Sequence, residues 1–348
     1  MKCIFLLSGD YIDLAKEEIC SLFKVVGSKS NGRLFIANIK NNEKEIKELS
    51  KRLALTKGVY RILFECKIDE LVKSMNKYDW SSVYKDNFCL RINAFNHGYS
   101  EKYLAKYVWR SVKNPKVDLE NPKTLIEIFI VDDEAYCGLL IFHNSENFEL
   151  RKPHLRPFPH PSSMHPKLAR ALVNISGVKE GEVLLDPFCG TGGFLIEAGL
   201  IGIKAIGYDI SKNMAKGCKD NLKHFGIKKF TIKNKNASEI TDKFDCVVTD
   251  LPYGLNSNIY LKYSKKSIDE KSNKINLKIN KTTQIKNIEK FYLKFLKKLR
   301  KILKKKAVII FPSYVNYKKL LKTAKFGIER EFEIYVHRSL TRKIVKIE

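Results

Sequence analysis

A glycine-rich turn between an apolar strand and a helix constrains the fold of this chain more than any other feature. From Leu184 to Phe194 the residues read Leu-Leu-Asp-Pro-Phe-Cys-Gly-Thr-Gly-Gly-Phe. Strand-like and helix-like patterns alternate around it, which is typical of an α/β fold with a parallel sheet covered by helices on both faces. We expect helices over 167–175, 193–200, 213–225 and 289–303, strands over 182–186, 204–209, 230–233, 246–250 and 307–311, and an antiparallel hairpin from 331–336 and 343–347.

The residue types around this turn indicate its ligand. Ligands of open α/β sheets bind at the carboxyl ends of the strands, where glycines let the backbone approach them closely. Asp209 ends the next strand nineteen residues after Gly190, a spacing that suits the two hydroxyls of a ribose. Asp186 would repel the pyrophosphate of a dinucleotide but attract the amino group of a methionine moiety, which disfavours a dehydrogenase. The turn resembles the Asp-Pro-Phe-x-Gly-x-Gly motif of methyltransferases that use S-adenosylmethionine (SAM).

We therefore predict SAM as the cofactor. Methyltransferases often carry an acid near the third strand to contact adenine, whereas residues 233–238 here read Lys-Asn-Lys-Asn-Ala-Ser. The amide of Asn236 can still hydrogen-bond the adenine amine. The predicted cofactor-binding residues are Asp186, Phe188, Gly190, Gly192, Asp209, Ile210, Asn236 and Ala237.

A second turn, Asp250-Leu251-Pro252-Tyr253, ends a later strand. An exocyclic base amine is a poor nucleophile because its lone pair conjugates with the ring. Asp250 and a backbone carbonyl of the turn could accept its two hydrogens and aim the lone pair at the methyl group, while Tyr253 stacks on the flipped base. The turn resembles the Asp/Asn-Pro-Pro-Tyr/Phe signature of amino-group methyltransferases. Leu251 stands where proline is usual, so the carbonyl is kept while the rigidity of proline is lost. All four residues are candidate catalytic residues.

Charge and composition narrow the class of partner. The chain of 348 residues carries a net charge of +27, of which residues 1–145 contribute only +4. A surplus concentrated in one region favours a nucleic-acid surface over a uniformly solvated lysine-rich one. The apolar run at 3–7 is too short for a signal segment, and no stretch is long enough to span a membrane, so we expect a soluble, cytoplasmic protein. The eight cysteines form no Cys-x-x-Cys pair, which predicts reduced thiols and no metal site.

The region before the glycine-rich turn has a different character. We predict small α+β units, with Asp10 capping a helix over 10–23, further helices over 43–55 and 102–112, and strands over 3–7, 33–39, 60–66, 88–95, 124–131 and 135–142. Five prolines and three histidines between 144 and 166 predict a semi-rigid linker, whose histidines we expect to be solvated.

Three further segments resemble one family. Residues 117–122 resemble the characteristic segment of a THUMP domain, and residues 160–170 and 336–342 resemble the helix before the catalytic domain and its carboxyl-terminal hairpin. With the two turns, the chain is similar to the archaeal-type tRNA (guanine(10)-N2)-methyltransferase family. The resemblance implies a ferredoxin-like piece (1–60), a THUMP domain (61–145), the linker (146–166) and a Rossmann-like methyltransferase domain (167–348).

The same resemblance implies the activity and the partner. One or two methyl groups would be transferred to the 2-amino group of guanosine 10 in tRNA, with the THUMP domain on the acceptor end. Alternatives are guanosine 6 of tRNA, a guanine of ribosomal RNA, an adenine of DNA, or an RNA-binding protein with an inactive fold. Sister enzymes for guanosine 6 tend to have Asn in place of Asp250, the THUMP-like segment argues against DNA, and the intact Asp186, Asp209 and Asp250 argue against inactivity. We expect a monomer, and the sequence does not indicate an activating subunit.

One segment is not explained by the resemblance. Residues 255–288 form a long insert, rich in Lys, Asn and Ile, between the catalytic turn and the next predicted helix. It is either a low-complexity loop without contacts or a segment that grips the tRNA backbone.

Overall fold

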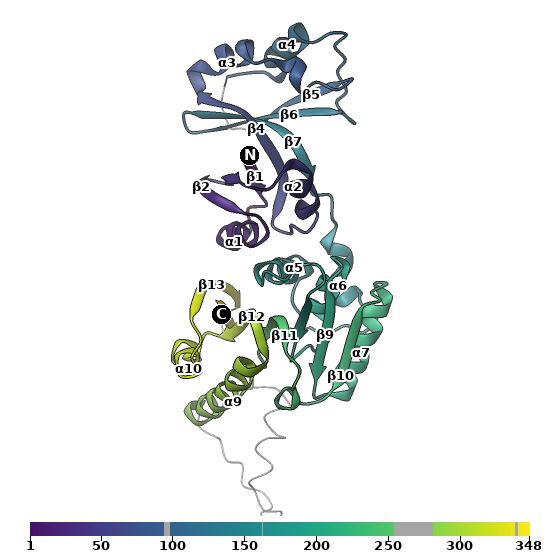
Figure 1. The fold of residues 1–348 in the computed structure, drawn as a ribbon, viewed down its shortest axis with the longest axis vertical. Coiled ribbons are helices and arrows are strands. Elements are labelled where there is room, and N and C mark those ends of the chain that lie inside the picture. Colours follow the sequence, from purple (N-terminus) through teal and green to yellow (C-terminus); the bar gives the residue numbers. More distant parts are fainter. Residues whose placement is uncertain (94–97, 162, 254–280, 338–339) are drawn as a thin grey trace, which may run out of the picture. The chain divides into compact units, whose positions relative to one another are not determined.

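The structure, a computed structural model, describes residues 1–93, 98–161, 163–253, 281–337 and 340–348. They form two compact units, Met1–Glu146 and Asn147–Glu348, each built on its own seven-stranded sheet (Figure 1). Most of the lysine-rich insert, residues 255–280, lies outside the described residues. Within the described ranges no helix is long and apolar enough to cross a membrane, and all eight cysteines are free.

The sheet of the N-terminal unit has the order β2-β3-β1-β4-β7-β6-β5. Its long strand β4, Thr56–Lys67, pairs with β1 on one side and β7 on the other, so the expected boundary after residue 60 falls inside a shared strand. The other strands are β1 (Lys2–Leu7), β2 (Val25–Asn31), β3 (Leu34–Ile39), β5 (Phe88–Asn93), β6 (Thr124–Val131) and β7 (Glu134–His143). The helices are α1 (Ile12–Leu22), α2 (Glu43–Ser50), α3 (Leu71–Lys77) and α4 (Glu101–Ser111).

The sheet of the C-terminal unit has the order β10-β9-β8-β11-β12-β14-β13. Strands β8 to β12 are parallel, and β14 and β13 close the edge as an antiparallel hairpin. The predicted α/β fold with its hairpin is thus confirmed. The strands are β8 (Val183–Asp186), β9 (Lys204–Asp209), β10 (Phe230–Asn234), β11 (Phe244–Asp250), β12 (Leu303–Pro312), β13 (Ile328–His337) and β14 (Leu340–Ile347). The strand order reverses between β8 and β11, which is the usual place for a ligand in such sheets.

Helices pack on this sheet through apolar faces. They are α5 (Pro166–Ile175), α6 (Gly193–Leu200), α7 (Lys212–His224), α9 (Lys281–Ile302) and α10 (Tyr317–Thr323). Tyr292, Phe295, Leu296 and Leu299 of α9 recur at helical spacing and are buried in the core of this unit. Figure 1 shows α6 and α7 beside β9 and β10, and α9 and α10 beside the half of the sheet that ends in β13.

Several expected elements differ from those observed. Asp10 does not cap α1; the helix follows Tyr11, whose left-handed backbone (φ 52°) occupies the cap position without a side-chain cap bond. Helix α9 begins at Lys281, eight residues before the predicted start, because polar residues mask its first two turns. The predicted helix 43–55 ends at Ser50. Strand β2 was not predicted because its side chains are mostly exposed and polar; α3 and α10 were also missed.

The segment expected to be a linker is instead packed against the C-terminal unit. Residues 147–166 belong to the C-terminal unit, where Phe148, Arg156 and Met164 are buried. Arg151 pairs with the fully buried Glu197 of α6 at 2.9 Å. This segment therefore docks on the sheet domain instead of running through solvent.

Candidate active site

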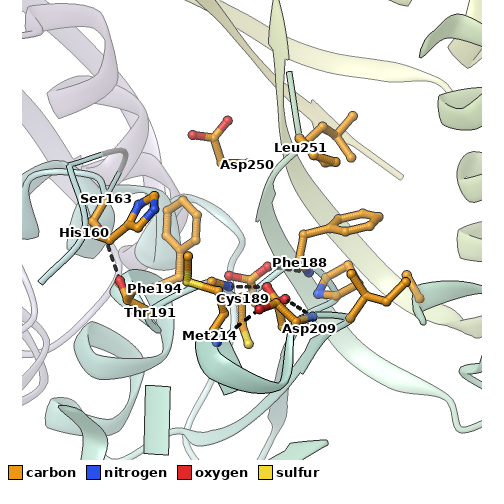
Figure 2. A pocket seen from close by; sticks show the side chains of 18 of the residues that line it. His160, Ser163, Phe188, Cys189, Thr191, Phe194, Asp209, Met214, Asp250 and Leu251 are labelled. Atoms are coloured by element: carbon orange, nitrogen blue, oxygen red, sulfur yellow. Dashed lines mark hydrogen bonds between the residues drawn. The ribbon is translucent and has the colours of Figure 1, made fainter. Parts of the chain in front are cut away.

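A cavity of about 590 Å³ opens at the carboxyl ends of four neighbouring parallel strands, β10, β9, β8 and β11. Both predicted turns border it, together with Asp209 after β9. Figure 2 shows Asp250 and Leu251 at one side of the cavity and Asp209 and Met214 at the other. Eleven of the twelve predicted site residues line it: Asp186, Phe188, Gly190, Asp209, Ile210, Asn236, Ala237, Asp250, Leu251, Pro252 and Tyr253.

Asp186 ends β8 beneath the cavity, where it is only 2% exposed. Its Oδ1 accepts hydrogen bonds from the Thr249 hydroxyl at 2.8 Å and from the Phe188 N–H at 3.1 Å. Burial raises the pKa of Asp186 to about 7, against the opposing effect of these donors, and the charges of Asp209 and Asp250 raise it further. Near neutral pH, this carboxyl group can therefore release a proton when a cation binds beside it.

Asp209 and Gly190 form a cradle on the other side of the turn. Both oxygens of the carboxylate accept backbone N–H bonds, from Gly190 at 2.9 Å and from Ser211 at 2.8 Å. Gly190 has φ +49°, and a Cβ there would meet no protein atom within 4 Å, so the glycine leaves open space beside the acid. Burial raises the pKa of Asp209. Since a carboxylate oxygen can accept more than one hydrogen bond, ribose hydroxyls can be added to this arrangement.

Two predicted cofactor residues have structural tasks of their own. Gly192 does not line the cavity; it caps α6 with φ +87°, and a Cβ there would lie 2.7 Å from Cys218 Sγ. Asn236 does line the cavity, but its Oδ1 accepts the Ser238 N–H, and Glu239 completes a capping box around this turn. The spacing of Asn236 and Glu239 is the sequence signal for that role.

Asp250 ends β11 on the opposite side of the cavity. The Tyr253 hydroxyl donates to its Oδ1, and Arg342 Nη2 lies 3.4 Å from its Oδ2. Burial raises the pKa of Asp250 to about 6, while Arg342 and the Tyr253 hydroxyl act in the opposite direction. The group is therefore ionised at neutral pH and can act as a hydrogen-bond acceptor.

Several contacts fix the turn that contains Leu251. The Leu251 N–H donates to the Ile310 carbonyl at 3.2 Å, which extends the β11–β12 pairing beyond the strand end. The hydroxyl of Tyr292 donates to the Pro252 carbonyl at 2.9 Å, and the hydroxyl of Tyr314 donates to the Tyr253 carbonyl. These bonds supply restraint at a turn that lacks the second proline.

The segment before α5 adds cavity residues that the sequence analysis did not assign to the site. His160, Ser163 and Met164 line the cavity, and the hydroxyls of Ser163 and Thr191 lie 2.7 Å apart. Residues 160–170 resemble a segment of the family, and this resemblance is the sequence signal for them. Other lining residues without a prediction are Pro187, Cys189, Thr191, Gly193, Phe194, Ser211, Met214 and Phe291.

Comparisons with known proteins agree with this geometry. A family model described as "RMKL-like, methyltransferase domain" matches residues 153–259, and a THUMP domain model matches residues 65–140. The tRNA (guanine(10)-N2)-dimethyltransferase of Methanothermobacter thermautotrophicus is 33% identical over 363 residues, covering 100% of this chain and 99% of that protein. Fold, site and matches together define a SAM-dependent methyltransferase with an N-terminal THUMP domain. The chain belongs to the tRNA (guanine(10)-N2)-dimethyltransferase family.

More distant proteins share parts of this similarity. The tRNA (guanine(6)-N2)-methyltransferase of Methanocaldococcus jannaschii is 23% identical over 318 residues, covering 79% of this chain and 80% of that one. The crystal structure of TrmN from Thermus thermophilus has a TM-score of 0.50 and 16% identity, with 100% and 99% of the two chains covered. At that identity the second match supports the fold alone.

Proposed function

We propose that the protein, as a monomer in the cytoplasm, methylates the exocyclic 2-amino group of guanosine 10 in tRNA. The observation that carries the chemistry is the placement of Asp209 and Asp250 in one cavity, each at the end of its own parallel strand. The full-length relative named above supports the nucleotide position, since it covers both units of this chain.

The residues at the β8 and β9 ends fit the cofactor. The open space beside Gly190 and the acceptor oxygens of Asp209 suit a ribose, and Asp186 suits an amino group. Bound SAM supplies an electrophilic methyl group on a sulfonium. The apolar ring of Phe188 and the turn at Ala237 border the part of the cavity that adenine would enter.

Asp250 and the turn carbonyls act on the target amine. An ionised Asp250 accepts one N–H of the amine, which turns the nitrogen lone pair away from the ring and toward the methyl group. The carbonyls of Pro252 and Tyr253 already accept tyrosine hydroxyls. The Leu251 carbonyl lies between Asp250 and these two residues in the sequence. We therefore assign the second N–H of the amine to the Leu251 carbonyl.

In this proposal, the flipped base stacks on the ring of Tyr253. The hydroxyl of Tyr253 is directed at Asp250, so the ring stands beside the acceptor that the amine needs. A base that enters must take over the Asp250 Oδ1 from this hydroxyl. The tyrosine ring can then stack on the face of the base while the carboxylate accepts a hydrogen bond from its edge.

A tRNA lacking one amino group tests the proposal. Inosine is guanosine without the 2-amino group, so a transcript with inosine at position 10 should accept no methyl group from labelled SAM. A matched transcript with inosine at position 6 should be methylated like the unmodified one. Methylation that persists with inosine 10 and disappears with inosine 6 would assign the enzyme to the other position. Equal labelling of both transcripts would point to another base.

A further inference from the structure

Arg342 joins the C-terminal hairpin to the catalytic turn. It lies on β14, far from the turn in sequence, and its side chain is 12% exposed. Its Nε donates to the Tyr253 hydroxyl at 3.1 Å and its Nη2 lies 3.4 Å from Asp250 Oδ2. Since the Tyr253 hydroxyl donates to Asp250 Oδ1, the three side chains form a closed network.

Several titratable groups lie near Asp250, but a permanent cation contacts its carboxylate. Asp186 of β8 and the phenols of Tyr292 and Tyr314 face the same region, and His160 borders the same cavity. Among the described residues, Arg342 is the only permanent cation in contact with the Asp250 carboxylate. By accepting from Arg342, the Tyr253 oxygen is also oriented with its hydrogen toward Asp250.

We propose that Arg342 is a positioning residue for methyl transfer, which holds Asp250 as an ionised acceptor and keeps Tyr253 over it until the guanine amine replaces the hydroxyl. This rests on the proposed function. Arg342 would not contact the amine itself. The step is an exchange of one hydrogen bond for another at Asp250 Oδ1, and no covalent bond of the protein changes.

The pH profile of single-turnover methylation tests this role. Removing a guanidinium from a carboxylate raises its pKa by about one unit or more, so Arg342→Gln should move the acid limb of the profile upward by that amount. Arg342→Lys should restore most of the shift, and Tyr253→Phe should shift the limb less. Lys343→Gln is the matched control, because Lys343 pairs with Glu333 on the same hairpin.

The outcomes separate positioning from folding. We expect SAM affinity to stay within about twofold of wild type in all four variants, since none changes a cofactor residue. An acid limb in Arg342→Gln that coincides with wild type, or a uniform loss at every pH with lost SAM affinity, would overturn the positioning role. If the wild-type enzyme itself did not methylate tRNA, the proposed function would fall and this role with it.

A second, independent feature is a groove along α9 beside the cofactor cavity. Its volume is about 240 Å³ and it shares Phe188, Asn236, Ala237 and Phe291 with the cavity. The rest of its lining comprises Ser238, Phe295 and four lysines, Lys294, Lys297, Lys298 and Lys301. No described acidic residue forms an ion pair with these lysines.

A lysine-rich helix face is often merely solvated, and α7 provides the comparison within this chain. Its Lys212, Lys216, Lys219 and Lys223 are exposed, but they line neither of the two cavities described here. Helix α9 differs because its lysines border a hollow continuous with the cofactor cavity. It is also tied to the catalytic turn by Tyr292. A tRNA phosphate at this rim of the cavity would therefore meet the lysines of α9.

We infer that the four α9 lysines bind the sugar-phosphate backbone of tRNA beside the cofactor cavity. This also rests on the proposed function. Each phosphate neutralised by a lysine releases counterions, so binding should depend on salt with a slope of about −0.7 to −0.9 per contact in log–log form. Phosphates are held equally before and during transfer, so KM should change more than kcat.

Two quadruple variants of equal charge test the inference. Replacing the four α9 lysines by Gln should flatten the salt slope of tRNA binding by about two to three units and raise KM for tRNA at least tenfold. Replacing the four α7 lysines should leave both values near wild type, and SAM affinity should be unchanged in each. Equal effects of the two sets, or no effect of either, would overturn the inference. Methylation of guanosine 10 by wild type, measured alongside, tests the function separately.

Discussion

The hydroxyl of Thr249 donates to Asp186 at 2.8 Å, so a residue of strand β11 holds the carboxyl group that ends strand β8. Both side chains are buried. Because Thr249 directly precedes Asp250, this bond links the carboxyl group beneath the cavity to the strand that ends at Asp250. A change of charge on Asp186 therefore alters the electrostatic environment of the turn that follows β11. In the other direction, the negative charge of Asp250 raises the pKa of Asp186.

The affinity for SAM should depend on pH through Asp186. Its pKa is about 7 without ligand, and a cationic amino group beside it favours the ionised form. SAM binding should therefore release a proton near neutral pH, and affinity should rise as pH increases from 6 to 8. Titration calorimetry in buffers of different ionisation enthalpy measures both effects. Thr249→Val should move the midpoint upward, because the hydroxyl lowers this pKa, and a flat profile in wild type would exclude Asp186 as the partner.

Asp209→Ala should weaken SAM binding at least tenfold. Each charge-assisted hydrogen bond contributes roughly 1.5–3 kcal/mol, and the mutation also releases the N–H groups of Gly190 and Ser211. Isothermal titration measures the loss. Asp220→Ala on the exposed face of α7 is the control. Unchanged affinity in Asp209→Ala would place the ribose elsewhere.

Glu197→Ala should destabilise the C-terminal unit by about 3–5 kcal/mol. Glu197 is fully buried and pairs with Arg151 and Arg170, so its removal takes a buried counter-charge away from both guanidinium groups. Urea unfolding measures the change. The exposed Glu180→Ala should stay within about 0.5 kcal/mol of wild type. A small effect of Glu197→Ala would mean that the segment from 147 to 166 is not held by this network.

The lysine-rich insert, outside the described residues, keeps its own prediction. If it contacts RNA, replacing Lys262, Lys265, Lys266, Lys271, Lys274 and Lys278 by Gln should flatten the salt slope of tRNA binding by several units. It should raise KM for tRNA more than it lowers turnover. Coinciding slopes would leave the RNA surface to the rest of the protein.

The sequence predicted those residues of the candidate site that belong to a recognisable turn. Asp186, Asp209 and Asp250 each end a strand beside a turn with a recognisable pattern, and parallel strands bring such ends to one edge. Helix α9 and strand β2 were misjudged where polar residues conceal the periodicity. Asn236 was read for its ligand chemistry, although its spacing from Glu239 also predicts a cap.

Long-range contacts explain what the sequence could not provide. Arg342, Tyr292 and Tyr314 reach the catalytic turn only because β14, α9 and the segment after β12 pack around it. Residues 336–342 resemble the family's carboxyl-terminal hairpin, but that resemblance does not indicate the contact of Arg342, and no motif accompanies Tyr292 or Tyr314. Hydrogen bonds from those elements restrain the turn at which Leu251 replaces a proline. The sequence of the turn alone does not predict these bonds.

The most direct test of the account is a comparison of cofactor binding and methyl transfer in Asp250→Ala. Removing this one acceptor should lower methylation of guanosine 10 at least about 100-fold. SAM affinity should stay near wild type, because the proposed function places Asp250 against the target amine and not against the cofactor. The exposed Asp242→Ala should resemble wild type in both assays. Wild-type turnover in Asp250→Ala, measured on the same tRNA at saturating SAM, would contradict the assignment of the catalytic turn.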